Sequence, residues 1–76
     1  MGKKSSVLVV DDEEALRSVL SNERINEGYD VQTASDGDDA MAEIDTTPFD
    51  LVLLDIKMPR VSGFEVLKHI KEHAGG

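Results

Sequence analysis

The stretch VLVVDDE at residues 7–13 decides the fold, because an unbroken apolar and largely β-branched run ends abruptly on acidic residues. A strand has this pattern when helices cover both faces of its sheet and leave no place for alternating polar side chains. A second run of the same kind, LVLLD at residues 51–55, also ends on an acid. We therefore expect two buried parallel strands, at residues 7–10 and 51–54, each followed directly by a carboxylate.

A helix is predicted over residues 14–27. Asp12 is a candidate N-cap, and Gly28 is expected to end the helix. The apolar residues at helical spacing are Leu16, Val19 and Leu20. Beyond residue 20 this inner stripe does not continue, so we expect the second half of the helix to be frayed or repacked.

The rest of the chain alternates in the same way. Residues 29–34 predict a second strand, and the Asp-Gly turn at residues 36–37 leads into a helix over 38–45. The sequence SGFE at residues 62–65 has the form of a helix capping box, and apolar residues at helical spacing follow it as far as about Glu72. Strands that alternate with helices predict an α/β fold, with parallel strands joined by right-handed crossovers.

The length and composition limit the protein to one small domain and argue against several classes of protein and of binding site. The 76 residues are 39% hydrophobic, and the absence of cysteine excludes disulfides and thiolate metal sites and suits a cytoplasmic location. No apolar run approaches the roughly 20 residues of a membrane span, and the first residues do not resemble a signal peptide. We therefore expect no membrane association. The net charge of −8 argues against nucleic-acid binding by this segment.

Three carboxylates follow the two apolar strands: Asp11, Asp12 and Asp55. Ligands of open parallel sheets bind outside the carboxyl ends of the strands, so these side chains converge if the two strands are neighbours. Clustered carboxylates repel one another unless a cation joins them, and a few hard oxygen ligands favour Mg²⁺. A single aspartate after a strand is often only a helix cap, but an acidic pair together with a third acid favours a site.

The segment DIKMPRVSG at residues 55–63 closely resembles the phosphoacceptor loop of response-regulator receiver domains, and VLVVDDE at residues 7–13 resembles their first strand and acidic pair. The resemblance covers essentially the whole chain. It implies a truncated flavodoxin-like, doubly wound fold with a three-stranded parallel sheet in the order 2-1-3 and three helices. Residues 1–76 would form a single truncated receiver domain, the N-terminal half of the family's domain, with flexible ends at residues 1–5 and 73–76.

The resemblance also implies roles for individual residues. Asp55 would accept a phosphoryl group from a sensor histidine kinase, in a reaction that receiver domains themselves catalyse. Asp12, assisted by Asp11, would hold Mg²⁺ or Mn²⁺ directly or through water. Asp55 and the backbone carbonyl of Lys57 would complete the protein's ligands to the metal.

The sequence also departs from the family, and alternatives stay open. The family places a Ser or Thr after its fourth strand and a Lys after its fifth, and this sequence ends before either position. The chain is therefore either a metal-dependent phosphoacceptor or a folding fragment or design module whose carboxylates are idle. A haloacid-dehalogenase-type enzyme fits less well, because it needs an acid where Lys57 stands. A metal site on His69 and His73 fits less well than two solvent-facing histidines.

Self-association is also expected. With no later strands in this sequence, the strand at residues 51–54 becomes an edge that carries neither charge nor proline. Such edges pair readily with other chains. We therefore expect a homodimer with two-fold symmetry, formed by pairing of third strands or by exchange of elements.

Overall fold

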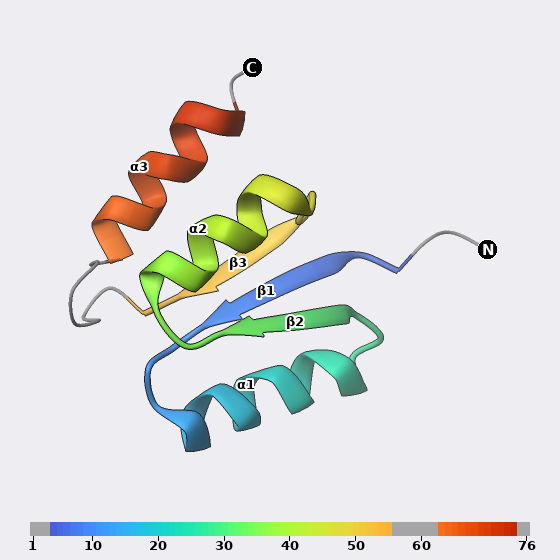
Figure 1. The fold of residues 1–76 in the computed structure, drawn as a ribbon. Coiled ribbons are helices and arrows are strands. Elements are labelled where there is room, and N and C mark those ends of the chain that lie inside the picture. The colour runs from blue at the N-terminus through green and yellow to red at the C-terminus, as the bar shows by residue number, and fades with distance from the viewer. Residues whose placement is uncertain (1–3, 56–62, 75–76) are drawn as a thin grey trace.

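The computed structural model describes residues 4–55 and 63–74, which form three strands and three helices in alternation. Their bounds are β1 (Ser6–Val10), α1 (Glu14–Asn26), β2 (Asp30–Ala34), α2 (Gly37–Thr46), β3 (Leu51–Leu54) and α3 (Gly63–Ala74). Helix α1 lies on one face of the sheet, and α2 and α3 lie on the other (Figure 1). Among the described residues, no helix combines the length and apolar character that crossing a bilayer requires.

The sheet has the order β2-β1-β3, and both pairs of strands are parallel. In its register Val10 stands opposite Ala34 on one side and opposite Leu54 on the other. The predicted strand order 2-1-3 is therefore confirmed. Because β1 and β3 are parallel neighbours, the residues that follow them leave the sheet side by side, at the carboxyl ends of the strands.

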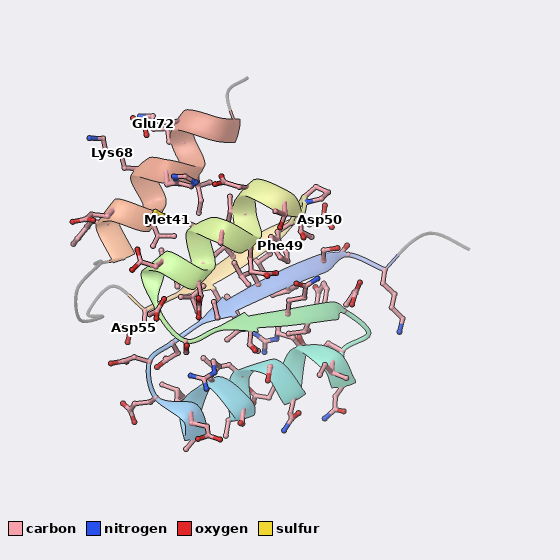
Figure 2. The ribbon with its side chains drawn as sticks, viewed as in Figure 1. Met41, Phe49, Asp50, Asp55, Lys68 and Glu72 are labelled. Carbon is pink, nitrogen blue, oxygen red and sulfur yellow. The ribbon has the colours of Figure 1, made fainter. Side chains whose placement is uncertain are left out.

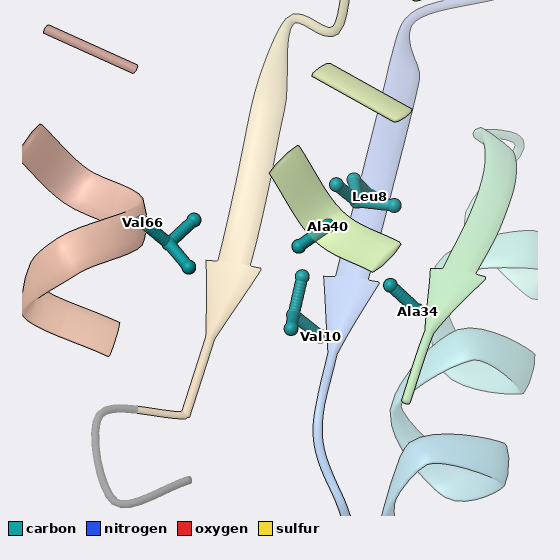
Figure 3. Close-up of a cluster of buried hydrophobic side chains, with 5 residues drawn as sticks. All are labelled: Leu8, Val10, Ala34, Ala40 and Val66. Carbon is teal, nitrogen blue, oxygen red and sulfur yellow. The ribbon is translucent and has the colours of Figure 1, made fainter. Parts of the chain in front are cut away.

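Strand β1 is buried on both faces, as its continuous apolar sequence predicts. Successive side chains of a strand point to opposite faces. Leu8 and Val10 belong to the core under α2 and α3, whereas Val7 and Val9 point toward α1, and all four are at most 1% exposed. The core cluster on the α2 and α3 side consists of Leu8, Val10, Ala34, Ala40 and Val66 (Figure 3).

Helix α1 differs from the prediction at its N-terminus and in its second half. Its N-cap is Glu13, with no side-chain capping bond, so the assignment of Asp12 as the cap is wrong. The second half of the helix, expected to be frayed or repacked, is not frayed, because the helix continues to Asn26. Near its end the Arg24 guanidinium pairs with Glu27, at 2.7 Å between Nε and Oε1. Gly28 follows with φ of 96°, a left-handed conformation that favours glycine and ends the helix as predicted.

The apolar stripe of α1 is only partly covered. Leu16 is 43% exposed and Val19 is 54% exposed, so they are not the inner residues that the helical spacing predicted. The physical reason is the position of the helix. Helix α1 packs on β1 and β2, and Leu16 and Leu20 of its stripe line an open space beside β3.

Helix α2 begins one residue earlier than predicted. Asp36 is its N-cap and accepts a hydrogen bond from the backbone N–H of Asp39 at 2.8 Å. The side chain of Asp36 therefore caps α2. Helix α3 packs beside α2 and places Val66 in the core. Ser62, the predicted cap of α3, lies outside the described residues.

Candidate functional site

The sheet itself brings the strand-end carboxylates together. Asp11 and Asp55 each follow directly after the paired residues Val10 and Leu54. The backbone N–H of Asp55 donates to the carbonyl oxygen of Val10 at 3.0 Å, and that of Asp11 donates to Ala34 at 3.2 Å. Hydrogen bonds of the sheet ladder therefore continue one residue beyond the strands and fix the backbone of both acids.

The three predicted carboxylates form a cluster. One carboxylate oxygen from each of Asp11, Asp12 and Asp55 lies within 4.8 Å of the other two. Asp11 is 4% exposed, Asp55 is half-buried and Asp12 is exposed. Figure 2 shows Asp55 at the carboxyl end of β3, on the side of the molecule where β1 ends. Lys57, the fourth predicted metal ligand, lies outside the described residues.

Two further hydrogen bonds fix Asp11. Its Oδ1 accepts from the backbone N–H of Glu13 at 2.8 Å, and its carbonyl oxygen accepts from Nη1 of Arg17 at 2.7 Å. No sequence pattern singled out Arg17 as a residue of the site. Helical side chains project toward the N-terminus of their helix, so an arginine one turn into α1 can reach back to the loop that precedes it.

The cluster lies at one end of a groove between α1 and β3, with a volume of about 680 Å³. Leu16 and Leu20 of α1 and Leu53 of β3 line its middle. Arg24 lines it from the last turn of α1. The α1 N-terminus lies beside the carboxylates, and the positive end of its helix dipole favours negative charge there. The groove is thus acidic at one end and apolar along its middle.

The donor set fits a hard divalent cation. Three carboxylates within 4.8 Å of one another, with Asp11 buried, bring together negative charge that is costly without compensation. Carboxylate oxygens are the ligands that Mg²⁺ and Mn²⁺ prefer, and exposed Asp12 leaves room for a hydrated ion.

His69 has a different environment from the one predicted. Its Nε2 lies 2.7 Å from Oδ1 of Asp45, and its side chain is 20% exposed. The expectation that His69 faces solvent is therefore wrong, because the contact with Asp45 joins α3 to α2. The side chain of His73, the other residue of the alternative metal site, lies outside the part of the chain that the structure describes.

Comparisons with known proteins agree with this geometry. The family model for the response regulator receiver domain matches residues 7–76. The alkaline phosphatase synthesis transcriptional regulatory protein PhoP of Bacillus subtilis is 43% identical over 72 residues, which are 95% of this chain and 29% of that protein. Response regulator RR06 of Streptococcus pneumoniae is 43% identical over 88% of this chain and 31% of its own length. This chain thus spans about a third of these relatives.

Solved structures show the same fold. Chemotaxis protein CheY4 of Vibrio cholerae superposes with a TM-score of 0.90 at 35% identity, over 95% of this chain and 60% of that one. The response regulator protein TrrA of Thermotoga maritima, in complex with Mg(2+)-BeF, gives a TM-score of 0.86 at 43% identity, over 90% of this chain and 59% of its own. TrrA in complex with histidine kinase ThkA gives 0.85 at 42% identity, over 91% of this chain and 60% of that one.

Proposed function

The chain belongs to the response regulator receiver domain family, and on that basis we propose that Asp55 accepts a phosphoryl group beside a divalent cation, Mg²⁺ or Mn²⁺, held by Asp11, Asp12 and Asp55. The observation that carries the proposal is the convergence of the three carboxylate oxygens within 4.8 Å, at the ends of two adjacent parallel strands. The backbone carbonyl of Lys57 is proposed as a further ligand from the family resemblance.

The reaction is a transfer to a carboxylate. A carboxylate oxygen of Asp55 forms a bond to phosphorus, while the bond from phosphorus to the donor atom breaks and the leaving atom keeps the electron pair. Such transfers pass through a loose transition state, so positioning and charge stabilisation supply most of the catalysis. The bound cation would offset the negative charge that the phosphoryl group brings to the carboxylates. The hydrogen bond from the N–H of Asp55 to Val10 holds the acceptor at the edge of the sheet.

The proposed donor is the phosphohistidine of a sensor histidine kinase. Support comes from the structural likeness to Thermotoga maritima TrrA, which has been solved with histidine kinase ThkA. The cysteine-free composition fits a cytoplasmic location, which stays a prediction. The net charge of −8 supports the expectation that this segment does not bind nucleic acid.

Intact-mass spectrometry tests the proposal. The chain is incubated with a small acyl phosphate in Mg²⁺ or in a chelator, together with the variants Asp55→Asn and Asp30→Asn. Asp30 is an exposed aspartate at the start of β2 and serves as the matched control. We expect a gain of one phosphoryl group that requires both Mg²⁺ and Asp55. If no phosphoryl group is gained, the carboxylates are idle and the alternative of an inherited, inactive site is correct.

We also propose that the 76-residue chain forms a homodimer through the free edge of β3. Among the described strands, β3 pairs with β1 alone. Leu51 is 44% exposed at the start of this strand. Antiparallel pairing about a two-fold axis would keep the two acidic clusters at opposite ends of the joined sheet, whereas parallel pairing would place them side by side. We therefore expect the antiparallel arrangement.

A further inference from the structure

Arg17 is a cationic residue that the proposed phosphoryl transfer does not use. It is partly buried in the first turns of α1. Its Nη1 donates to the backbone carbonyl oxygen of Asp11 at 2.7 Å. A bond of this kind from a charged donor is stronger than a bond between neutral groups. The side chain therefore ties α1 to the loop that carries the acidic pair.

The bond completes a set of contacts on Asp11. The N–H of Asp11 donates to Ala34, and its Oδ1 accepts from Glu13. Arg17 donates to the remaining backbone group of Asp11, its carbonyl oxygen. That carbonyl belongs to the peptide unit that joins Asp11 to Asp12. Because a peptide unit is planar, holding its oxygen restricts the direction in which the chain continues into Asp12.

Positioning and charge make opposite predictions for this arginine. A positive group close to a cation site weakens cation binding by repulsion. If charge were its main effect, its removal would tighten metal binding. If it holds the backbone of the acidic pair, its removal lets the exposed Asp12 move away from Asp11 and Asp55, and metal binding weakens.

We propose that Arg17 is a positioning residue, which holds the peptide between Asp11 and Asp12 so that all three carboxylates meet around one divalent cation. This inference rests on the proposed function, because it assumes a metal at the acidic cluster. Groups that orient metal ligands from outside the coordination shell typically change metal affinity about 10–100-fold when they are removed.

Mn²⁺ binding to the 76-residue protein tests the inference. In Arg17→Met the apolar length of the side chain stays and the donors are lost, so we expect the dissociation constant to rise about tenfold. Arg17→Lys keeps a charged donor and should recover most of the affinity. Arg24→Met is the matched control, since Arg24 lies on the same helix but pairs with Glu27, and it should change the affinity less than about twofold.

A second readout needs no metal. The backbone N–H of Glu13 donates to Oδ1 of Asp11 at 2.8 Å, and the N–H of Asp39 donates to Asp36 in the same way at 2.8 Å. In metal-free Arg17→Met, amide hydrogen exchange should become faster at Glu13 and stay unchanged at Asp39.

The outcomes separate the two proposals. Tighter Mn²⁺ binding by Arg17→Met would show that charge dominates, and unchanged binding would show that Arg17 positions nothing; either result overturns the inference and leaves the metal site standing. If the unmodified protein binds no Mn²⁺, the proposed metal site itself is wrong and the metal role of Arg17 falls with it. Weaker binding that Arg17→Lys restores supports the inference.

Discussion

The two aspartates of the acidic pair, Asp11 and Asp12, have different environments although they are adjacent in sequence. Asp11 is 4% exposed and is held through its N–H, its carbonyl and its carboxylate. Asp12 is exposed and can meet a hydrated ion. A buried carboxylate that accepts a backbone hydrogen bond is kept in one place. An exposed carboxylate can replace a water molecule in the coordination shell of an incoming ion. The pair thus combines one fixed and one accessible carboxylate.

This difference makes Asp12 the residue to change. Mg²⁺ at one hundred times its dissociation constant should stabilise the folded protein by about 2.7 kcal/mol, because a ligand that binds only the folded state shifts the equilibrium by mass action. Asp12→Ala should remove most of that gain, while the stability in chelator stays equal or rises slightly from reduced repulsion. Thermal unfolding with and without Mg²⁺ measures both, with Asp30→Ala as the control. Equal gains in all three proteins would count against a metal site at this cluster.

At the scale of helices and strands, the sequence predicted those features that depend on local patterns. The continuous apolar runs of β1 and β3 identified two strands and the acids that follow them, since strand ends and sheet neighbours follow from general rules. The burial of α1 could not be predicted in the same way. Helical spacing gives an apolar stripe, but which side is covered depends on where the helix lies over the sheet. Arg17 was missed because its bond to Asp11 depends on that same placement.

The N-cap of α2 gives a prediction at this scale. Asp36 accepts from the N–H of Asp39 at 2.8 Å and satisfies a donor that would otherwise have no partner within the helix. Asp36→Ala should reduce the free energy of unfolding by about 1 kcal/mol. Asp36→Ser, which keeps a capping oxygen, should restore most of it. Urea denaturation measures the difference, and equal stability of the Ala and Ser variants would show that the cap contributes nothing.

The attachment of α3 gives a second prediction. Val66 is fully buried in the core cluster, whereas the next residue of the helix, Leu67, is 46% exposed. Val66→Ala should reduce the free energy of unfolding by about 2 kcal/mol, from lost burial and the cavity it leaves. Leu67→Ala should cost less than about 0.5 kcal/mol. If both variants lose the same stability, α3 does not place Val66 in the core as described.

For the molecule as a whole, apolar surface stays exposed around the sheet. Among residues 4–55 and 64–72, whose side chains the structure describes, the large hydrophobic residues with more than 40% exposure are Leu16, Val19, Ile25, Leu51, Phe64 and Leu67. Exposed apolar surface next to a free strand edge favours association, while the net charge of −8 opposes it. Screening of this repulsion by salt should therefore strengthen any association.

Sedimentation equilibrium at micromolar concentration checks the expected dimer. We expect two copies per particle, with more dimer at higher salt. Leu51→Lys places a charge on the exposed start of β3 and should shift the protein to monomer, because charged edges resist pairing. Leu67→Lys, a similar change on α3, should leave the dimer intact. A monomer with a sharp unfolding transition would show that the three-stranded sheet is stable by itself and that the free edge of β3 does not drive association.

The central claim is that Asp55 is the phosphoacceptor, and chemical mapping of the phosphoryl group tests it most directly. Borohydride reduces an aspartyl phosphate to homoserine, so treatment after incubation with the acyl phosphate and Mg²⁺ marks the modified residue for peptide sequencing by mass spectrometry. Homoserine should appear at position 55, and omission of Mg²⁺ should abolish it. Homoserine at position 11 or 12 instead, or equal yields with and without Mg²⁺, would contradict the account.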